Sequence, residues 1–288
     1  MAYDGLVLIT GASGKTARRC LVHLVARGAR VRALVRRQEA ALELLEAGAA
    51  DAIVGDLFDA DTIALACAGA QQVLHICPPM HPKEAEVART MIAQAQSAGV
   101  ARFVLWSVLH PHINVPHHRR KQIAEAVLID SGLPFTILQP GRYMQHLDTI
   151  WSAVRDSGVH AFPFSVDSYF SLTHLDDLAE VCARVLTEKG HEHATYELAG
   201  PEALSQKDCA AIIARTLGRP VAAQAAPLES TMAKARIAGF PEWRIETLRA
   251  MNMHYDAHGL KGNSNVLRWL LRREPRTFAD YVAELSLG

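Results

Sequence analysis

Residues 6–17 read LVLITGASGKTA, and this stretch decides the fold. The apolar run Leu6–Ile9 predicts a short buried strand, and the spacing of apolar residues from Lys15 to about Arg27 predicts a helix directly after it. Glycines between a strand and a helix permit a tight turn and the close approach of a pyrophosphate, which the N–H groups of the helix N-terminus attract. We therefore expect a dinucleotide-binding turn, with an ordinary glycine-rich turn as the alternative. The candidate contacts are Gly11, Ser13, Gly14, Lys15 and Thr16.

The alternation of strand and helix continues beyond this turn. Apolar strands are expected at 31–35, 52–54, 73–77, 103–106 and 135–138, and helices at 40–47, 59–67, 83–98 and 119–131. Continuous apolar strands separated by amphipathic helices are typical of a parallel sheet that is covered on both faces. The sequence therefore predicts an α/β fold in which residues 1–145 form a Rossmann-type, doubly wound parallel sheet.

The pattern loosens after Pro140. Strands at 169–172 and 196–198 and a helix at 175–188 are expected, and residues from about 170 to 200 are expected to contribute to the first domain. A capping box beginning at Ser205 predicts a helix over 209–217, which Gly218 ends. Three helical segments follow Leu228. Residues 146–288 are therefore expected to form largely a smaller, mostly helical lobe that binds the substrate.

The composition argues against several classes of protein. Half of the 288 residues are hydrophobic, and 30 basic side chains balance 30 acidic ones. A net charge of zero argues against nucleic-acid binding, which needs an excess of Lys and Arg. The five cysteines form no CxxC pair and no apolar run reaches about 18 residues, so neither a disulfide framework, a zinc knuckle nor a membrane span is expected. Because the first strand starts so early, we expect no signal peptide and a cytoplasmic protein.

The segment between Gly5 and Gln38 is basic throughout. It holds eight Lys or Arg residues and no Asp or Glu. In NAD-binding proteins an acidic residue about 20 positions beyond the turn binds the ribose 2′-hydroxyl. Here the second strand ends at Arg36 and Arg37. An arginine can form two parallel hydrogen bonds to a 2′-phosphate, which an acidic side chain would repel. We therefore expect NADPH/NADP+ as cofactor, with Arg36 as the main clamp and Lys15 or Arg37 assisting; the alternative is a solvated basic edge.

Further motifs keep a characteristic order along the chain: GDLFD at 55–59, SGLPFTILQP at 131–140, DDLA at 176–179 and YELAGPE at 196–202. Together with the turn and residues 31–36, they make nearly the whole chain resemble the NmrA-like branch of the atypical short-chain dehydrogenases/reductases. The resemblance implies that Asp56 and Leu57 lie by the adenine and that Cys77 and Pro78 line the cofactor cleft. Pro140 is a further candidate cofactor contact. The resemblance also implies a substrate pocket in the C-terminal lobe.

The usual catalytic pair of short-chain dehydrogenases is missing. That pair is a Tyr acid and a Lys four residues later, which lowers the pKa of the Tyr, and none of the six Tyr has such a Lys. In its place stand His117 and Lys121, after Ser107 at the end of a strand. We expect Lys121 to hold the nicotinamide ribose, His117 to supply a proton and Ser107 to bind a carbonyl or the nicotinamide. The plainer alternatives are an exposed helix Lys, a solvated His in a proline-rich loop and a strand cap.

Four histidines fall within nine positions: His110, His112, His117 and His118. A zinc site would need three or four ligands in a tetrahedron, commonly with a Cys or a carboxylate, and this segment contains neither. Its two prolines also suggest an open loop. We therefore expect no metal site, and a loop that lines the pocket over the nicotinamide.

The run after Pro140 supplies candidate substrate contacts. Tyr143, Met144 and His146 follow the strand expected to border the nicotinamide. Phe170, with Trp151, Phe162 and Phe164, could add apolar walls that suit a flat aromatic ligand, although core packing is the alternative for each of them.

The sequence thus favours one function over a rival from another class. The favoured function is an NADPH-dependent reductase that transfers a hydride from nicotinamide C4. Its substrate would be small: aromatic, quinone-like, an enone or a benzylic ether. The resemblance also admits a non-catalytic NADP(H) sensor that regulates partner proteins, and the missing Tyr favours that alternative. A homodimer stays open.

Overall fold

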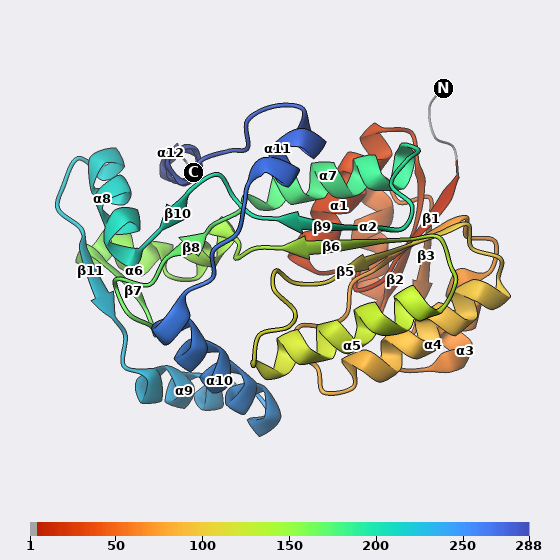
Figure 1. The fold of residues 1–288 in the computed structure, drawn as a ribbon, viewed down its shortest axis with the longest axis horizontal. Helices are drawn as coiled ribbons and strands as arrows, with labels where there is room; N and C mark the ends of the chain where they lie inside the picture. Colours follow the sequence, from red (N-terminus) through yellow and green to blue (C-terminus); the bar gives the residue numbers. More distant parts are fainter. Residues whose placement is uncertain (1–4, 288) are drawn as a thin grey trace. The chain divides into compact units, whose positions relative to one another are not determined.

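The computed structural model describes residues 5–287, which divide into two compact units (Figure 1). Unit 1 comprises residues 5–112, 118–139 and 178–196, and unit 2 comprises 113–117, 140–177 and 197–287. A seven-stranded sheet has the order β3-β2-β1-β4-β5-β6-β9, and every neighbouring pair from β3 to β6 is parallel. The predicted α/β fold with a doubly wound, Rossmann-type sheet is confirmed.

The elements that build the sheet and its cover alternate along the chain. They are β1 (Leu6–Ile9), α1 (Lys15–Ala26), β2 (Arg30–Val35), α2 (Gln38–Glu46), β3 (Asp51–Val54), α3 (Ala60–Cys67), β4 (Gln72–His75), α4 (Glu84–Ser97), β5 (Arg102–Trp106), α5 (Pro116–Asp130), β6 (Phe135–Pro140), α7 (Leu175–Thr187) and β9 (Ala194–Leu198). In Figure 1, α3, α4 and α5 cover one face of the sheet, and α1 and α7 cover the other.

The central strands are apolar because both of their faces are buried. Every residue of β1, β4, β5 and β6 is buried. One core cluster joins Phe103 and Ile137 of the sheet to Met91 of α4 and Leu128 of α5. This burial explains why the strands read as continuous apolar runs rather than as alternating ones.

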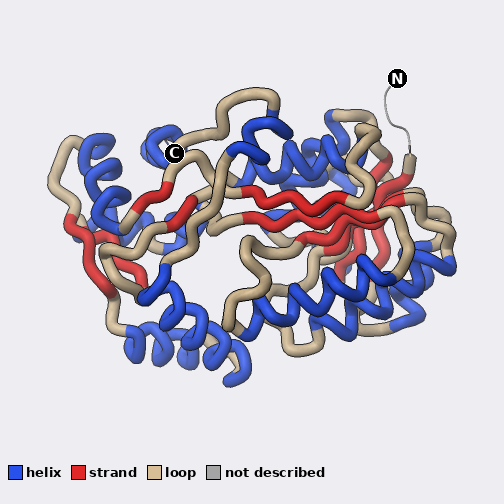
Figure 2. The backbone as a smooth tube through the Cα atoms, viewed as in Figure 1, coloured by secondary structure: helices blue, strands red, loops and turns tan. Residues whose placement is uncertain are grey.

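Unit 2 is mainly helical, as expected, and Figure 2 shows its short strands among the helices. Its other elements are η1 (Met144–Thr149), α6 (Trp151–Ser157), β7 (Val159–Phe162), β8 (Phe170–Ser171), β10 (Ala203–Leu204), α8 (Gln206–Leu217), β11 (Ala222–Ala225), α9 (Leu228–Ile237), α10 (Glu242–His258), α11 (Asn265–Leu271) and α12 (Phe278–Leu287). The capping box is present: Ser205 and Asp208 bond each other's backbone N–H, and Gly218 ends α8 with φ 65°.

Four details differ from the sequence-based expectations. Helix α5 begins at Pro116 rather than at Arg119, because the fixed φ of proline suits the first position of a helix. The pairs β7–β11 and β8–β10 were not fully foreseen, since Ala222–Ala225 lacks the β-branched residues that mark a strand. The tail after Leu228 forms four helices instead of three. Strand β6 extends to Pro140.

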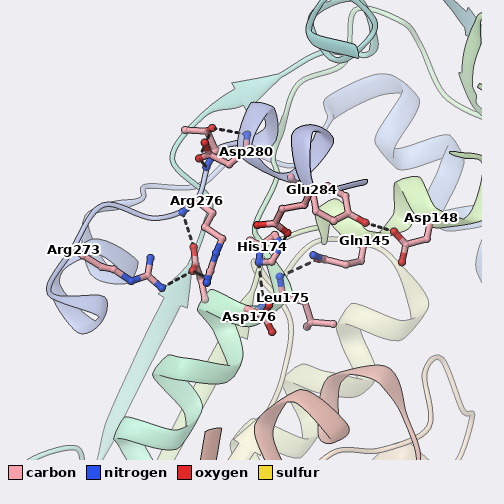
Figure 3. A network of polar contacts seen from close by, with 12 residues as sticks. Gln145, Asp148, His174, Leu175, Asp176, Arg273, Arg276, Asp280 and Glu284 are labelled. Atoms are coloured by element: carbon pink, nitrogen blue, oxygen red, sulfur yellow. Dashed lines mark hydrogen bonds and ion pairs between the residues drawn. The ribbon is translucent and has the colours of Figure 1, made fainter. Parts of the chain in front are cut away.

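A buried carboxylate fastens the C-terminal segment of unit 2 to the start of α7 (Figure 3). Asp177 is fully buried, and it accepts hydrogen bonds from Arg273 Nη2 at 2.8 Å, from Arg276 N at 2.7 Å and from the Arg276 guanidinium. Nearby, the Tyr281 hydroxyl of α12 donates to Asp148 of η1. The first contacts join the segment 273–276 to Asp177, and the last joins α12 to η1, all within unit 2.

Replacing Asp177 by Asn removes the charge that both arginines share and keeps the shape of the side chain. Breaking a buried ion pair costs about 3–5 kcal/mol, and the two arginines are about one-third exposed, so we expect the free energy of unfolding to fall by about 2–3 kcal/mol. Urea denaturation measures this loss. Asp176→Asn makes the same charge change one residue earlier and should cost less than about 1 kcal/mol. Equal losses in the two variants would contradict the assignment.

Candidate functional site

The turn between β1 and α1 is shaped for the close approach of an anion. Gly11 has φ 60°, and a Cβ there would lie 2.7 Å from the carbonyl oxygen of Ile76. Gly14 is the N-cap of α1; in this described helix no side chain caps the N-terminus and no acid lies in the first turn. Ser13 and Lys15 are exposed and Thr16 is half-buried. The N–H groups of Ala12 and Gly14 already bond the carbonyls of Leu34 and Gly11, whereas others at the N-terminus of α1 can bind a phosphate, whose charge the helix dipole favours.

The arginines of the basic segment have different surroundings. Arg32 is paired with Asp51 at 2.7 Å, and Arg27 with Glu188 at 3.2 Å. Arg36, exposed directly after β2, forms no ion pair with an acidic side chain among residues 5–287. Arg37 is the N-cap of α2. That position is set by the backbone and no side-chain cap bond is formed, so Arg36 and Arg37 both present exposed guanidinium groups at this strand end.

Two further predicted cofactor contacts lie beyond β3. Asp56 is exposed, and its Oδ1 accepts a hydrogen bond from Phe58 N at 3.0 Å. Leu57 is buried in the core cluster of unit 1. A Cβ on Gly55 would lie 2.4 Å from Thr62 Cγ2, so α3 packs closely under this loop. Asp56 is therefore an exposed polar group of this loop, together with Asp59, whose carboxylate caps α3.

Lys121 lies between the start of α4 and the end of β5. Its Nζ donates to the Trp106 carbonyl at 2.7 Å and lies 2.5 Å from the carboxylate of Glu84, which is 2% exposed. Lys121 is thus largely buried and ion-paired, not an exposed helix lysine. Sequence reasoning missed Glu84; the only signal was an acid in the first turn of an expected helix.

Two buried groups near Lys121 are neutral at pH 7. Burial, reinforced by the charge of Glu84, raises the pKa of the Cys77 thiol to about 12. Burial, reinforced by the charge of Lys121, lowers the pKa of His75 to about 3, and the His75 Nδ1 lies 3.0 Å from the Thr10 hydroxyl. Pro78, beyond Cys77, is half-buried. His75 and Cys77 therefore add no charge beside the ion pair of Lys121 and Glu84.

Ser107 is buried and bonded to a carboxyl group. Its hydroxyl donates to Glu125 of α5, and Gln139 Nε2 donates to both carboxyl oxygens of Glu125, each at 3.0 Å. Burial raises the pKa of Glu125, while the hydrogen bonds from Ser107 and Gln139 lower it less. Ser107 therefore has a partner that neither sequence-based alternative foresaw. Lys121 and Glu125 lie one turn apart on α5. Because Lys121 bonds Trp106 and Glu125 bonds Ser107, both side chains lie at the end of β5.

The histidine segment is a loop only up to residue 115, and helix α5 follows from Pro116. Because α5 begins at Pro116, His117 lies in its first turn, and the expectation of a solvated histidine in a proline-rich loop is wrong. The spacing of His117 and Lys121 places them on one face of the helix. His118 is buried, with Nδ1 3.0 Å from the His110 carbonyl oxygen, and His112 is exposed. Within residues 5–287, no three His, Cys, Asp or Glu side chains are grouped as metal ligands.

The predicted substrate contacts gather at one pocket of unit 2. Tyr143, Met144, His146 and Phe170 all line it, and Trp151 does not. The other lining residues are Arg142, Leu147, His160, Phe162, Phe164, Leu172, Leu204, Ser205, Gln206, Cys209 and Phe278. The rings of Tyr143 and His146 stack with centroids 5.6 Å apart. The predominantly apolar wall suits a flat ring.

Arg142 is the charged residue of this pocket that sequence reasoning passed over. Its guanidinium carbon lies 4.7 Å, 5.0 Å and 5.4 Å from the ring centroids of Phe162, Phe164 and Phe170. The one signal was a basic residue inside the short run 141–146 that supplied the other contacts.

Fold and turn together define a dinucleotide-binding α/β protein of the Rossmann type. The chain belongs to the NmrA-like family, which matches residues 3–282. No helix within residues 5–287 is long and apolar enough to cross a membrane.

Two proteins at 28% and 26% identity and a third that shares the fold are similar to this chain. The NAD(P)H azoreductase of Xenophilus azovorans is 28% identical over 279 residues, which are 96% of each chain. The crystal structure of the NADPH-dependent quinone oxidoreductase QOR2 of Escherichia coli, in complex with NADPH, has a TM-score of 0.86 and 26% identity, and covers 97% of this chain and 99% of that one. NmrA, a negative transcriptional regulator crystallised with NADP, shares the fold with a TM-score of 0.78 at 17% identity, over 98% and 95% of the two chains.

The raised pKa of Glu125 predicts a pH-dependent stability. The folded state favours the neutral carboxyl group, so the stabilisation is present at low pH and is lost as the pH rises through the folded pKa, which lies above the ordinary 4.5. Relative to Glu125→Gln, the wild type should therefore lose free energy of unfolding as the pH rises from about 4 through the raised pKa of Glu125. Urea denaturation across this range measures the difference, with the exposed Glu86→Gln in parallel. A difference that grows in the opposite direction would refute the assignment.

Proposed function

We propose that this protein is an NADPH-dependent reductase whose substrate is a small quinone-like or aromatic electrophile, an enone or a benzylic ether. The observation that carries the proposal is Arg36, which is exposed at the end of β2 where NAD-binding proteins have an acid. Arg36 has no acidic ion-pair partner within residues 5–287. The similarity to an azoreductase and a quinone oxidoreductase supports the same activity.

The residues of unit 1 fit the cofactor. The turn at Gly11 and Gly14 leaves no room for a side chain near Ile76 and presents an uncapped helix N-terminus, which suits the pyrophosphate. Arg36, assisted by Lys15 or Arg37, would bind the 2′-phosphate. The other contacts proposed in unit 1 are Ser13, Thr16, Asp56, Leu57, Cys77, Pro78 and Lys121. Pro140, which belongs to unit 2, is a further candidate from the sequence. Bound NADPH supplies a hydride from nicotinamide C4.

The roles proposed for the catalytic residues follow from their contacts. Lys121 would orient the nicotinamide ribose, and its pairing with Glu84 and the Trp106 carbonyl restricts its side chain before any ligand binds. His117 or water would supply the proton. Ser107, bonded to Glu125, would present its hydroxyl oxygen as an acceptor. Quinone, enone and benzylic-ether reduction do not need the missing Tyr.

The pocket of unit 2 would take the substrate ring. Tyr143, Met144, His146 and Phe170 supply its proposed contacts. Flat aromatic groups bind well in such pockets because apolar surface and ring stacking both contribute. The partner of the protein is therefore a small molecule.

Arg36→Asp tests the choice of cofactor. Charge reversal removes a charge-assisted fork and adds repulsion, so NADPH affinity should fall about 100-fold while NADH affinity changes less than about threefold. Fluorescence titration with both nucleotides measures this selectivity. Arg30→Asp makes the same change at the opposite, exposed end of β2 and should alter neither affinity. An equal loss of NADPH and NADH binding in Arg36→Asp would refute the clamp.

Lys121→Met tests whether the protein is a reductase or the non-catalytic NADP(H) sensor that the missing Tyr favours. We expect the wild type to oxidise NADPH with at least one member of a panel of quinones, azo dyes, enones and benzylic ethers. In Lys121→Met, kcat should fall at least about 100-fold, as after loss of a group that positions the reacting atoms, while NADPH still binds. The substitution leaves the Glu84 carboxylate buried without its cation. The double variant Glu84→Gln/Lys121→Met, which also removes this carboxylate charge, is therefore measured as a control. Selective NADP(H) binding without turnover of the whole panel would establish the sensor instead.

A further inference from the structure

The pocket of unit 2 contains a cation among aromatic rings. Arg142 leaves β6 just before η1, and its guanidinium lies over Phe162, Phe164 and Phe170. Burial lowers the pKa of Arg142, although the group stays charged because arginine begins so high. The residue keeps partial exposure, and it lines the pocket. A ligand in the pocket can therefore contact the guanidinium.

The polar groups around this guanidinium carry no negative charge at pH 7. Burial raises the pKa of the Cys209 thiol to about 12 and that of the Tyr255 hydroxyl to about 12. Burial, reinforced by Arg142, lowers the pKa of His160 to about 4. No carboxylate within residues 5–287 pairs with Arg142, whereas Asp177 serves two arginines of the same unit. The positive charge of Arg142 is not neutralised by the described chain.

Aromatic rings only partly replace a counter-ion. A guanidinium over a ring gains about 0.5–2 kcal/mol, whereas an unpaired charge in a low-dielectric interior costs several kcal/mol. Buried charges are for that reason paired in most proteins. The fork of an arginine matches two oxygens of a carboxylate or sulfonate, and the rings hold it in place for such a group.

We propose that this pocket selects aromatic ligands that bear an anionic oxygen group, carboxylate or sulfonate, with the anion bound by Arg142 and the ring packed against the apolar wall. This inference rests on the proposed function in one respect: it takes the anionic aromatic ligand to be the substrate of the reductase. The anionic substituent then fixes the orientation of the aromatic ring in the pocket. Arg142 thereby determines specificity, and the chemistry stays with other residues.

Binding of a matched pair of probes tests the inference without turnover. Naphthalene-2-sulfonate and naphthalene-2-sulfonamide have the same ring and nearly the same shape, and only the sulfonate is charged at pH 7. Calorimetry should show the wild type binding the sulfonate at least about tenfold more tightly, as expected for a charge-assisted fork. Arg142→Met should lose this preference, and Arg142→Lys should retain part of it. Equal affinities in the wild type, or a preference that survives Arg142→Met, would overturn the proposal.

A second arginine provides the matched control. Arg244 also lies over a ring, 4.0 Å from the Phe240 centroid, and does not line the pocket. Arg244→Met should leave the sulfonate preference unchanged. Thermal melting of each variant separates lost binding from lost folding; if Arg142→Met unfolds, the wild-type preference and Arg142→Lys decide the outcome. Loss of the preference in Arg244→Met as well would show a general charge effect and overturn the assignment to Arg142.

Turnover separates this inference from the proposed function. The substrates are 1,2-naphthoquinone and its 4-sulfonate, each with NADPH, and the readout is the ratio of their kcat/KM values in Arg142→Met relative to wild type. We expect the sulfonate to lose at least about tenfold more than the neutral quinone. Sulfonate binding through Arg142 without turnover of either quinone would refute the reductase and support the pocket assignment. Turnover of the neutral quinone with an unchanged ratio would support the reductase and refute the pocket assignment.

Discussion

The parallel pairing of β1 with β2 on one side and β4 on the other is the constraint on which unit 1 depends. Parallel neighbours require a crossover for each strand, and the crossovers are helices that cover both faces. The carboxyl ends of the parallel strands then lie along one edge of the sheet. Ligands of open α/β sheets bind outside this edge. Thr10, Arg36, His75 and Ser107, which are far apart in sequence, each lie at or just beyond such a strand end.

Three polar side chains at this edge, Ser107, Lys121 and Glu125, have partners inside the protein before any ligand arrives. Lys121 is opposed by Glu84, and Glu125 accepts from Ser107 and Gln139. Removing a single partner would leave a buried charge or acceptor alone, which is the costly case for such networks. The side chains consequently have little freedom to reorganise. A site of this kind is preorganised, and preorganised dipoles and charges are what stabilise a transition state most effectively.

Sequence patterns predicted the parts of the fold that are set by local periodicity. The strand–turn–helix at 6–26 and the capping box at Ser205 were predictable, because each depends on residues within a few positions of one another. The start of α5 was misplaced because proline both breaks helices and opens them, and only the structure shows which applies at Pro116. Glu84 was missed for another reason: its pairing with Lys121 joins two helices, and no spacing rule within one segment reports it. Strand β11 is Ala-rich and owes its existence to its partner β7.

The arginines of unit 2 have two kinds of partner. Arg273 and Arg276 share the buried carboxylate of Asp177, so their charges serve the packing of the C-terminal segment. Arg142 has aromatic rings instead of an acid, in the same unit and at the wall of a pocket. If its task were only to fill space between Phe162 and Phe170, an apolar side chain of similar volume would do so without the desolvation cost. Beyond its contact with the rings, a guanidinium adds two hydrogen-bond donors in a planar pair and a charge, and an anion in the pocket would use both.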